Sequence, residues 1–523
     1  MFSPLIHRYI FLFGICTMGG SMLFGTVPTS TPQIILFANW VFEGNFKEKL
    51  SGIKSNRIFW ILSSVFLMHI LGLLHTSNTE SGLNDIRIKV PLMLLPLVFF
   101  STKPLNKKEL HLLLALFVTG IIASSFWCIY YYYSHILIDL RKVSRFMSHI
   151  RFGLFINMGI CTLVYFIVRS KKTIDRIISV SLIMYLLWFM LNFGLVTGLV
   201  LFGFISLAFL FYLIIKQNIK IKLLGFSVLV IGACLGIWFV NNEWKKNNFI
   251  DTSAANKPKQ KSVTGRVYNK LGNNNQTENG FYLAYNIQYE ELFSSWPKRS
   301  QIGILGNDKK GNSVMWTILR YMTSKGLTKD SAGLTQLTKA DIENIEKGIT
   351  NYKYADASPL KKRVKEFLSE YQDYKNGANP SGNTMLMRFE FWKAAIYIIK
   401  RNVWMGVGTG DAQAAFNKAY YRTETKLAHN WRLRSHNQFL AITVSFGILG
   451  LVLFIFSLVY PVFVLRKKLS GLYFAFLFIA LISFLTEDTL ESQSGVSFFA
   501  YFNTLFLWLG FNSNPEDETN QNL

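Results

Sequence analysis

Residues 437–464 read NQFLAITVSFGILGLVLFIFSLVYPVFV and contain no charged side chain. An apolar run of this length crosses about 30 Å of hydrocarbon when it forms an α-helix. The run therefore predicts a membrane-spanning helix. It follows directly on a polar segment, Arg434-Ser435-His436, so we expect this segment at the boundary between lipid and water.

The composition of the whole chain is that of a membrane protein. Of its 523 residues, 51% are hydrophobic and only 16% are charged, whereas a soluble domain carries about 25% charged residues. The four cysteines stand singly within apolar runs, so no disulfide or metal framework is expected. We expect contacts with membrane lipids and none with nucleic acid.

Working outward from the first run, we predict an all-α integral membrane protein with about twelve transmembrane helices. The predicted spans lie near residues 8–27, 31–42, 58–74, 88–101, 109–134, 149–168, 174–192, 194–215, 221–241, 437–464, 470–486 and 495–511. The break around Asn192-Phe193-Gly194 separates the seventh span from the eighth.

The charges of the short loops predict the orientation. Alternate short loops are rich in Lys and Arg, which marks the cytoplasmic side of a membrane protein. This pattern places both termini in the cytoplasm and residues 242–386 on the outer side. It also places residues 135–148 outside, although this loop carries Arg141, Lys142 and Arg145. Binding of an anionic ligand would explain cations on that side.

We therefore expect four parts in the chain, with the protein in a bacterial inner membrane. Residues 1–241 carry transmembrane helices 1–9, 242–386 form a large periplasmic loop, 387–436 form a periplasmic amphipathic helix and catalytic loop, and 437–523 carry transmembrane helices 10–12 and a cytoplasmic tail. Within the loop, Thr338 to Ile349 and Ser358 to Lys375 are predicted helices, and Phe281 to Leu292 resembles a strand.

Three motifs after the loop carry the chemistry. They are Met387-Arg388-Phe389-Glu390-Phe391-Trp392, then Gly406-Val407-Gly408-Thr409-Gly410, and then Arg434-Ser435-His436-Asn437-Gln438-Phe439-Leu440, followed by Phe446-Gly447. This order resembles the O-antigen ligase family, which includes lipopolysaccharide ligases and Wzy-type polymerases. The detailed resemblance covers about residues 385–465.

Several of these residues also have a purely structural explanation. The Gly406–Gly410 stretch lacks a following Gly-Lys-Ser/Thr, so we interpret it as a tight turn and not as a phosphate loop. Trp392 and Trp404 are typical of interfacial anchors. His69 is expected to be a packing residue. His429 is a weaker candidate than His436 for a histidine that takes part in the reaction.

The resemblance implies a function. It predicts a GT-C-like glycosyltransferase that moves an undecaprenyl-diphosphate-linked glycan onto an acceptor sugar hydroxyl, such as that of the lipid A core or another glycan, at the periplasmic face. The reaction would serve polysaccharide or lipopolysaccharide biosynthesis. Direct attack on the anomeric carbon would invert it. We expect no cofactor and no metal, because no Asp-x-Asp motif lies on the outer side and Glu487, Asp488 and Glu491 give only a weak signal.

Residue chemistry assigns roles to two of the matching positions. His436 is the expected general base, because an imidazole titrates near neutral pH. Arg388 is expected to bind the donor diphosphate, because its planar guanidinium can contact two oxygens at once. Many family members carry a Ser-Arg pair near the eighth span, but residues 195–199 contain no Arg. Arg151 or Arg145 could replace that contact.

Two alternatives stay open. The enzyme could polymerise repeat units instead of ligating a finished glycan. The chain could also be a lipid-linked glycan transporter or flippase. A transporter should show internal repeats and charged residues in mid-span. The two halves of this chain look unlike each other and its spans are nearly free of charge, which favours an enzyme.

Overall fold

The computed structural model describes residues 3–134, 143–215, 258–271, 277–355 and 379–513, with scattered positions in 219–245 and 365–377. These residues divide into two compact units. The helical unit comprises Met1–Leu210, Phe391–Glu424 and Arg432–Leu523, and the loop unit comprises Phe211–Glu390 and Thr425–Trp431. Each unit is described by itself below.

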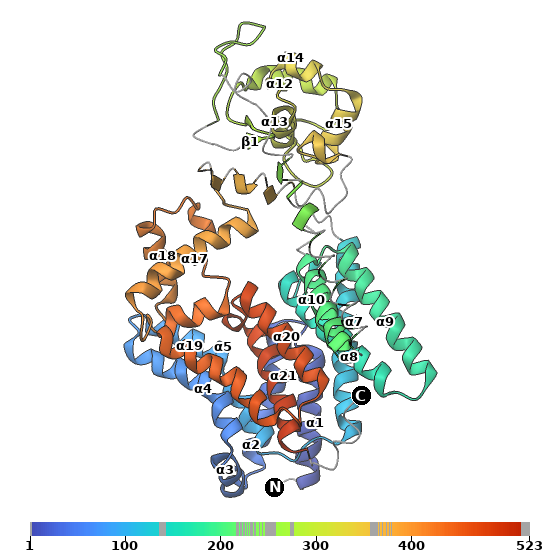
Figure 1. Cartoon of the computed structure of the whole chain (residues 1–523), viewed down its shortest axis with the longest axis vertical. Helices are drawn as coiled ribbons and strands as arrows, with labels where there is room; N and C mark the ends of the chain where they lie inside the picture. The colour runs from blue at the N-terminus through green and yellow to red at the C-terminus, as the bar shows by residue number, and fades with distance from the viewer. Residues whose placement is uncertain are drawn as a thin grey trace. The chain divides into compact units, whose positions relative to one another are not determined.

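The helical unit is built from long apolar helices joined by short turns (Figure 1). Its first half contains α1 (Pro4–Ser21), α2 (Thr26–Phe42), α3 (Phe46–Lys54), α4 (Arg57–Leu71), α5 (Thr79–Lys89), α6 (Pro91–Phe100), α7 (Lys107–Ser134), α8 (His149–Arg169), α9 (Thr173–Asn192) and α10 (Val196–Ile215). Its second half contains most of α17 (Thr384–Arg401), then α18 (Ala412–Arg422), α19 (Gln438–Leu465), α20 (Gly471–Thr486) and α21 (Gln493–Phe511). Short 3₁₀ turns lie at η1 (Gly72–His75) and η6 (Thr489–Glu491).

The helices confirm an all-α membrane protein in outline. Among the described residues, seven helices are long and apolar enough to cross a membrane: Arg57–His75, Lys107–Ser134, His149–Arg169, Thr173–Asn192, Val196–Ile215, Gln438–Leu465 and Gln493–Phe511. Helices α1, α2, α6 and α20 coincide with predicted spans but fall outside this set. The predicted ninth span, 221–241, lies where only scattered positions are described. Twelve spans therefore stays a prediction.

Helix α21 forms the centre of the helical unit. It packs against α6 and α20, and 83% of its most apolar stretch is buried inside the protein. Phe502 meets Phe117 of α7 edge to face at 4.8 Å, and Trp508 meets Phe99 of α6 at 5.1 Å. Aromatic pairs of this geometry contribute about 0.5–1.5 kcal/mol each beyond their buried area. The Tyr501 hydroxyl donates to the Ile15 carbonyl of α1 at 2.8 Å, which satisfies a buried polar group.

A break in α19 is held by the glycine turn at 406–410. Gly447 interrupts the helix at φ 65°, ψ −163°, and Gly406 and Gly408 adopt φ +68° and +92°. The amides of Val407 and Gly408 donate to the Val444 and Ser445 carbonyls, each at 2.9 Å, which the break has exposed. Backbone groups without water must be paired inside the protein. The turn is therefore structural, as its sequence predicted.

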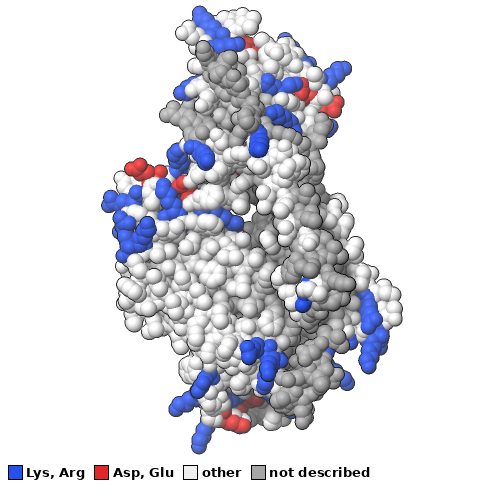
Figure 2. All heavy atoms as spheres, in the orientation of Figure 1, with Lys and Arg blue, Asp and Glu red and all other residues white. Residues whose placement is uncertain are grey.

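The outward faces of these helices are apolar. Helix α19 exposes Val452, Ile455, Phe456, Val459 and Phe463 on one side. In Figure 2, the face in view shows almost no charged side chains over α4 and α19, while Lys and Arg gather over α17 and α18 and around α3. An uncharged surface of this width is typical of contact with lipid chains.

The loop unit has a hydrophobic core of its own. Its described elements are β1 (Thr277–Glu278), β2 (Phe281–Tyr282), α12 (Tyr289–Ser295), η3 (Trp296–Lys298), α13 (Val314–Ser324), α14 (Ser331–Thr335), α15 (Lys339–Glu346) and η4 (Tyr352–Tyr354). Trp296, Tyr321 and Leu292 are fully buried in it. The predicted helix at Thr338 is confirmed by a capping box with Asp341. The predicted strand at 281–292 forms only at Phe281–Tyr282, with Ile287 in isolated β-bridges, and it is wrong from Gln288 onward because Gln288 caps a helix there.

Candidate functional site

His436 sits where the loop after α18 turns into α19. Asn437 caps that helix, since its side-chain oxygen accepts from the Leu440 amide at 3.0 Å. His436 itself adopts φ +46°, in the left-handed region that side chains other than glycine rarely occupy. Strained backbone of this kind persists only where its surroundings hold it, and it is concentrated at functional sites.

Two acidic residues from the turn between α20 and α21 face the His436 ring. The ring Nδ1 lies 3.1 Å from Glu487 Oε2 and 3.9 Å from Asp488 Oδ1. A carboxylate only accepts hydrogen bonds, so Nδ1 carries the proton and donates to Glu487. In this tautomer Nε2 has no proton and can take one up. Phe391 of α17 packs against the same ring at 5.4 Å.

The surroundings of this turn shift the pKa of Asp488. Burial raises the pKa of the Asp488 carboxyl, the His436 ring opposes this, and Glu491 and Glu487 raise it further. Glu487 is itself buried, at 8% exposure. A buried carboxylate beside a histidine stabilises the imidazolium that forms when the histidine accepts a proton.

The segment that carries His436 is fixed by α17 and α18. Trp392 Nε1 donates to the Ser435 carbonyl at 3.1 Å, and the Tyr420 hydroxyl donates to the Leu433 carbonyl. Trp392 is thus half-buried in the site and does more than anchor the protein in an interface. Phe391 is 2% exposed, so this aromatic residue of α17 packs inside the protein. Trp404 is 66% exposed, as expected of an anchor.

A second charged cluster adjoins this turn, and no pattern in the sequence predicted it. Glu491 forms ion pairs with Arg434 at 3.2 Å and with Lys89 of α5 at 3.1 Å. Lys89 also forms an ion pair with Asp85 at 2.6 Å. Burial raises the pKa of Asp85 to about 6. Burial would also raise the pKa of Glu491, but Lys89 and Arg434 outweigh it and lower that pKa to about 2. Gln438 bridges Glu491 to the Leu490 amide.

The predicted diphosphate residues are spread over both units. Arg145 and Arg151 lie in the helical unit, as His436 does, and Arg388 lies on α17 in the loop unit. Arg145 stacks over Tyr131 at 5.3 Å. Arg151 is in the first turn of α8, half-buried, and none of the described residues gives its guanidinium a hydrogen bond or ion pair. Arg141 and Lys142 lie outside the described residues.

The remaining histidines have simpler roles. His69 is buried, with its Nδ1 2.7 Å from the Val65 carbonyl and its ring against Phe446 at 4.7 Å. This confirms the interpretation of His69 as a packing residue. His429 belongs to the loop unit and is exposed.

His436, Glu487 and Asp488 could also hold a cation. One ligand atom from each lies within 4.8 Å of the others, and a nitrogen with two carboxylate oxygens is a donor set that Zn²⁺ accepts. In the sequence, Glu487, Asp488 and Glu491 are only a weak signal for a metal site, and His436 lies some fifty positions before them. The hydrogen bond from His436 to Glu487 accounts for the same closeness, and metal independence stays a prediction.

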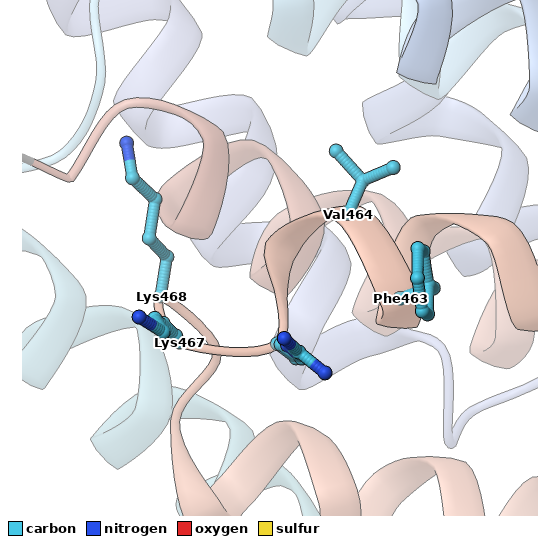
Figure 3. Close-up of a pocket in the computed structure, with 5 residues that line it drawn as sticks. Phe463, Val464, Lys467 and Lys468 are labelled. Carbon is cyan, nitrogen blue, oxygen red and sulfur yellow. The ribbon is translucent and has the colours of Figure 1, made fainter.

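A cavity of about 400 Å³ lies at the other end of α19. It is lined by Phe463, Val464, Arg466, Lys467 and Lys468 (Figure 3). The Lys468 amine donates to the Ser513 carbonyl at 3.0 Å. Because α19 separates this end from His436 by its whole length, the cavity is not part of the site around His436.

Comparison with known proteins identifies the segment around His436. The family described as O-antigen ligase matches residues 333–455, a stretch that contains Arg388, the glycine turn, His436 and the break at Gly447. No curated protein matches the chain. Residues 333–455 are thus similar to the O-antigen ligase family, in a mostly helical chain whose described residues contain seven candidate membrane spans.

Proposed function

We propose that this protein is a glycosyltransferase of the inner membrane that transfers a polyprenyl-diphosphate-linked glycan to an acceptor sugar hydroxyl at the periplasmic face. The observation that carries the proposal is the His436–Glu487 pair, with 3.1 Å between Nδ1 and Oε2, inside the segment that matches the O-antigen ligase family. The pair supplies a general base whose tautomer is fixed. The family implies a lipid-linked glycan and an acceptor as substrates.

The proposed reaction needs one proton transfer and one displacement. The acceptor hydroxyl gives its proton to His436 Nε2 as its oxygen attacks the anomeric carbon of the donor sugar. The bond from that carbon to the diphosphate oxygen breaks, and polyprenyl diphosphate leaves with the bonding electrons. Glu487 stabilises the imidazolium formed in this step. A single displacement inverts the anomeric carbon.

The leaving diphosphate needs positive charge, and it needs no proton. Arg388 is our candidate to bind it, with Arg151 and Arg145 as further contacts. All three carry a permanent charge and can form forked hydrogen bonds with phosphate oxygens. The unpaired guanidinium of Arg151 among the described residues supports a role in anion binding.

Glycan analysis of a deletion strain tests the proposal. A ligase predicts unmodified acceptor together with long carrier-linked chains, whereas a polymerase predicts acceptor bearing single repeat units. A strain whose surface glycans are unchanged would contradict both. Accumulation of carrier-linked glycan that a spheroplast-impermeant glycosidase cannot reach would indicate a flippase instead.

A further inference from the structure

Arg434 lies two residues before His436, and both side chains are held by the same short turn. His436 contacts Glu487 at one end of residues 487–491, and Arg434 contacts Glu491 at the other end. The same five-residue segment, 487–491, therefore holds both the base and a guanidinium. The mechanism above gives Arg434 no role.

The guanidinium of Arg434 keeps part of its donor capacity. Nε donates to Gln413 Oε1 at 3.4 Å, and Nη1 donates to Glu491 Oε2 at 3.2 Å. In the part of the chain that the structure describes, Nη2 has no partner, and the side chain is 30% exposed. An arginine has five N–H donors, so the edge formed by Nη1 and Nη2 can still bind an oxyanion in a fork.

The backbone on both sides of Arg434 is already fixed. Tyr420 holds the Leu433 carbonyl and Trp392 holds the Ser435 carbonyl. A side chain that starts from a fixed backbone loses less conformational entropy when it binds a ligand. Glu491 does not fully neutralise Arg434, because the same carboxylate also forms an ion pair with Lys89, which is fully buried.

We propose that Arg434 binds the diphosphate of the lipid-linked donor next to the base His436. The proposal rests on the proposed function and adds a donor-binding residue to it. The leaving group and the attacking hydroxyl would then meet residues of one rigid segment.

Binding of undecaprenyl diphosphate tests this proposal. The full chain is reconstituted in nanodiscs of zwitterionic phosphatidylcholine, and the dissociation constant is measured for wild type, Arg434→Lys, Arg434→Gln and a control, Arg176→Gln. Arg176 is an exposed arginine of α9, so the control loses the same charge elsewhere. We expect Arg434→Gln to weaken binding about 10-fold or more, since it removes hydrogen bonds from a charged donor to the diphosphate. The control should match wild type.

Arg434→Lys separates binding from folding. Lysine keeps the charge that pairs with Glu491 but cannot form a fork, so this variant should fold like wild type, with an unchanged melting temperature, and bind a few-fold more weakly. Equal binding by wild type and both Arg434 variants would overturn the proposal and leave the proposed function intact. A wild-type protein that does not bind undecaprenyl diphosphate would overturn the proposed function itself. Loss of binding on adding phosphatidylglycerol would show that Arg434 binds lipid phosphates generally, which also overturns the proposal.

Discussion

At the scale of single residues, the account depends on His436. Its φ of +46° makes the usual alanine substitution ambiguous, because alanine is strained in the left-handed region. Asparagine tolerates this region well and cannot act as a base. We expect His436→Asn to lower the transfer rate about 10²–10⁴-fold with normal insertion and an unchanged melting temperature. Transfer at the wild-type rate would make His436 structural and direct attention to His429.

A second prediction at this scale concerns Arg388. Lysine supplies a point charge, which is enough for a lipid head group but not for a forked contact with a diphosphate. We expect Arg388→Lys to lose most of the transfer activity while the protein stays abundant. Arg422→Lys is the matched control, because Arg422 is an exposed arginine at the end of α18. Full activity of the Arg388 variant would favour Arg151 or Arg145 as the donor contact.

At the scale of elements, the glycine turn and the broken helix α19 depend on each other. A Cβ at Gly447 would lie 2.2 Å from the Trp404 carbonyl oxygen, and the φ and ψ of this residue are accessible almost only to glycine. We expect Gly447→Ala to cost more than about 3 kcal/mol and to abolish the monodisperse peak in size-exclusion chromatography. Gly203→Ala in α10, where a Cβ would meet nothing within 4 Å, should leave that peak unchanged. A well-folded Gly447→Ala variant would show that the break is dispensable.

The loop unit should lose stability in acid. Burial would raise the pKa of Glu291, but hydrogen bonds from Ser262, Ser331 and Thr264 outweigh it and lower that pKa to about 2. A carboxyl whose pKa is lower in the folded state stabilises that state above its unfolded value of about 4.3, and this contribution is lost as the pH falls towards 2. Hydrogen exchange of α12, corrected for the intrinsic rate, should therefore become faster between pH 5 and pH 3. Glu291→Gln should show fast exchange already at pH 7, and equal protection at both pH values would contradict this.

The sequence predicted the elements better than their contacts. The apolar runs predicted the helices because their length and composition are local properties. The predicted break at Asn192-Phe193-Gly194 is confirmed, since Gly194 adopts φ +66° between α9 and α10. The sequence predicted only part of the site. His436 stands out by its position before α19, whereas its partner Glu487 lies about fifty residues further along the chain, and Lys89, which pairs with Glu491, lies at the end of α5. Pairing between distant residues depends on how the helices pack, which hydrophobicity patterns do not specify.

At the scale of the whole molecule, the orientation in the membrane is the main prediction. The basic short loops place the termini in the cytoplasm and residues 242–386 outside. A single cysteine introduced at Asn312 in a cysteine-free background should react with an impermeant maleimide in intact spheroplasts. A cysteine at Lys468 should react only after permeabilisation. The reverse pattern would contradict the orientation, and with it a periplasmic site.

Glycan transfer by the purified protein tests the central claim most directly. The full chain in nanodiscs is given an undecaprenyl-diphosphate-linked glycan and an acceptor glycan, with and without EDTA, and both the glycan product and released undecaprenyl diphosphate are measured. We predict that the two products form in equal amounts, that EDTA has no effect, and that His436→Asn stops both. Absence of transfer by wild-type protein that binds the donor, or equal transfer by His436→Asn, would contradict the account.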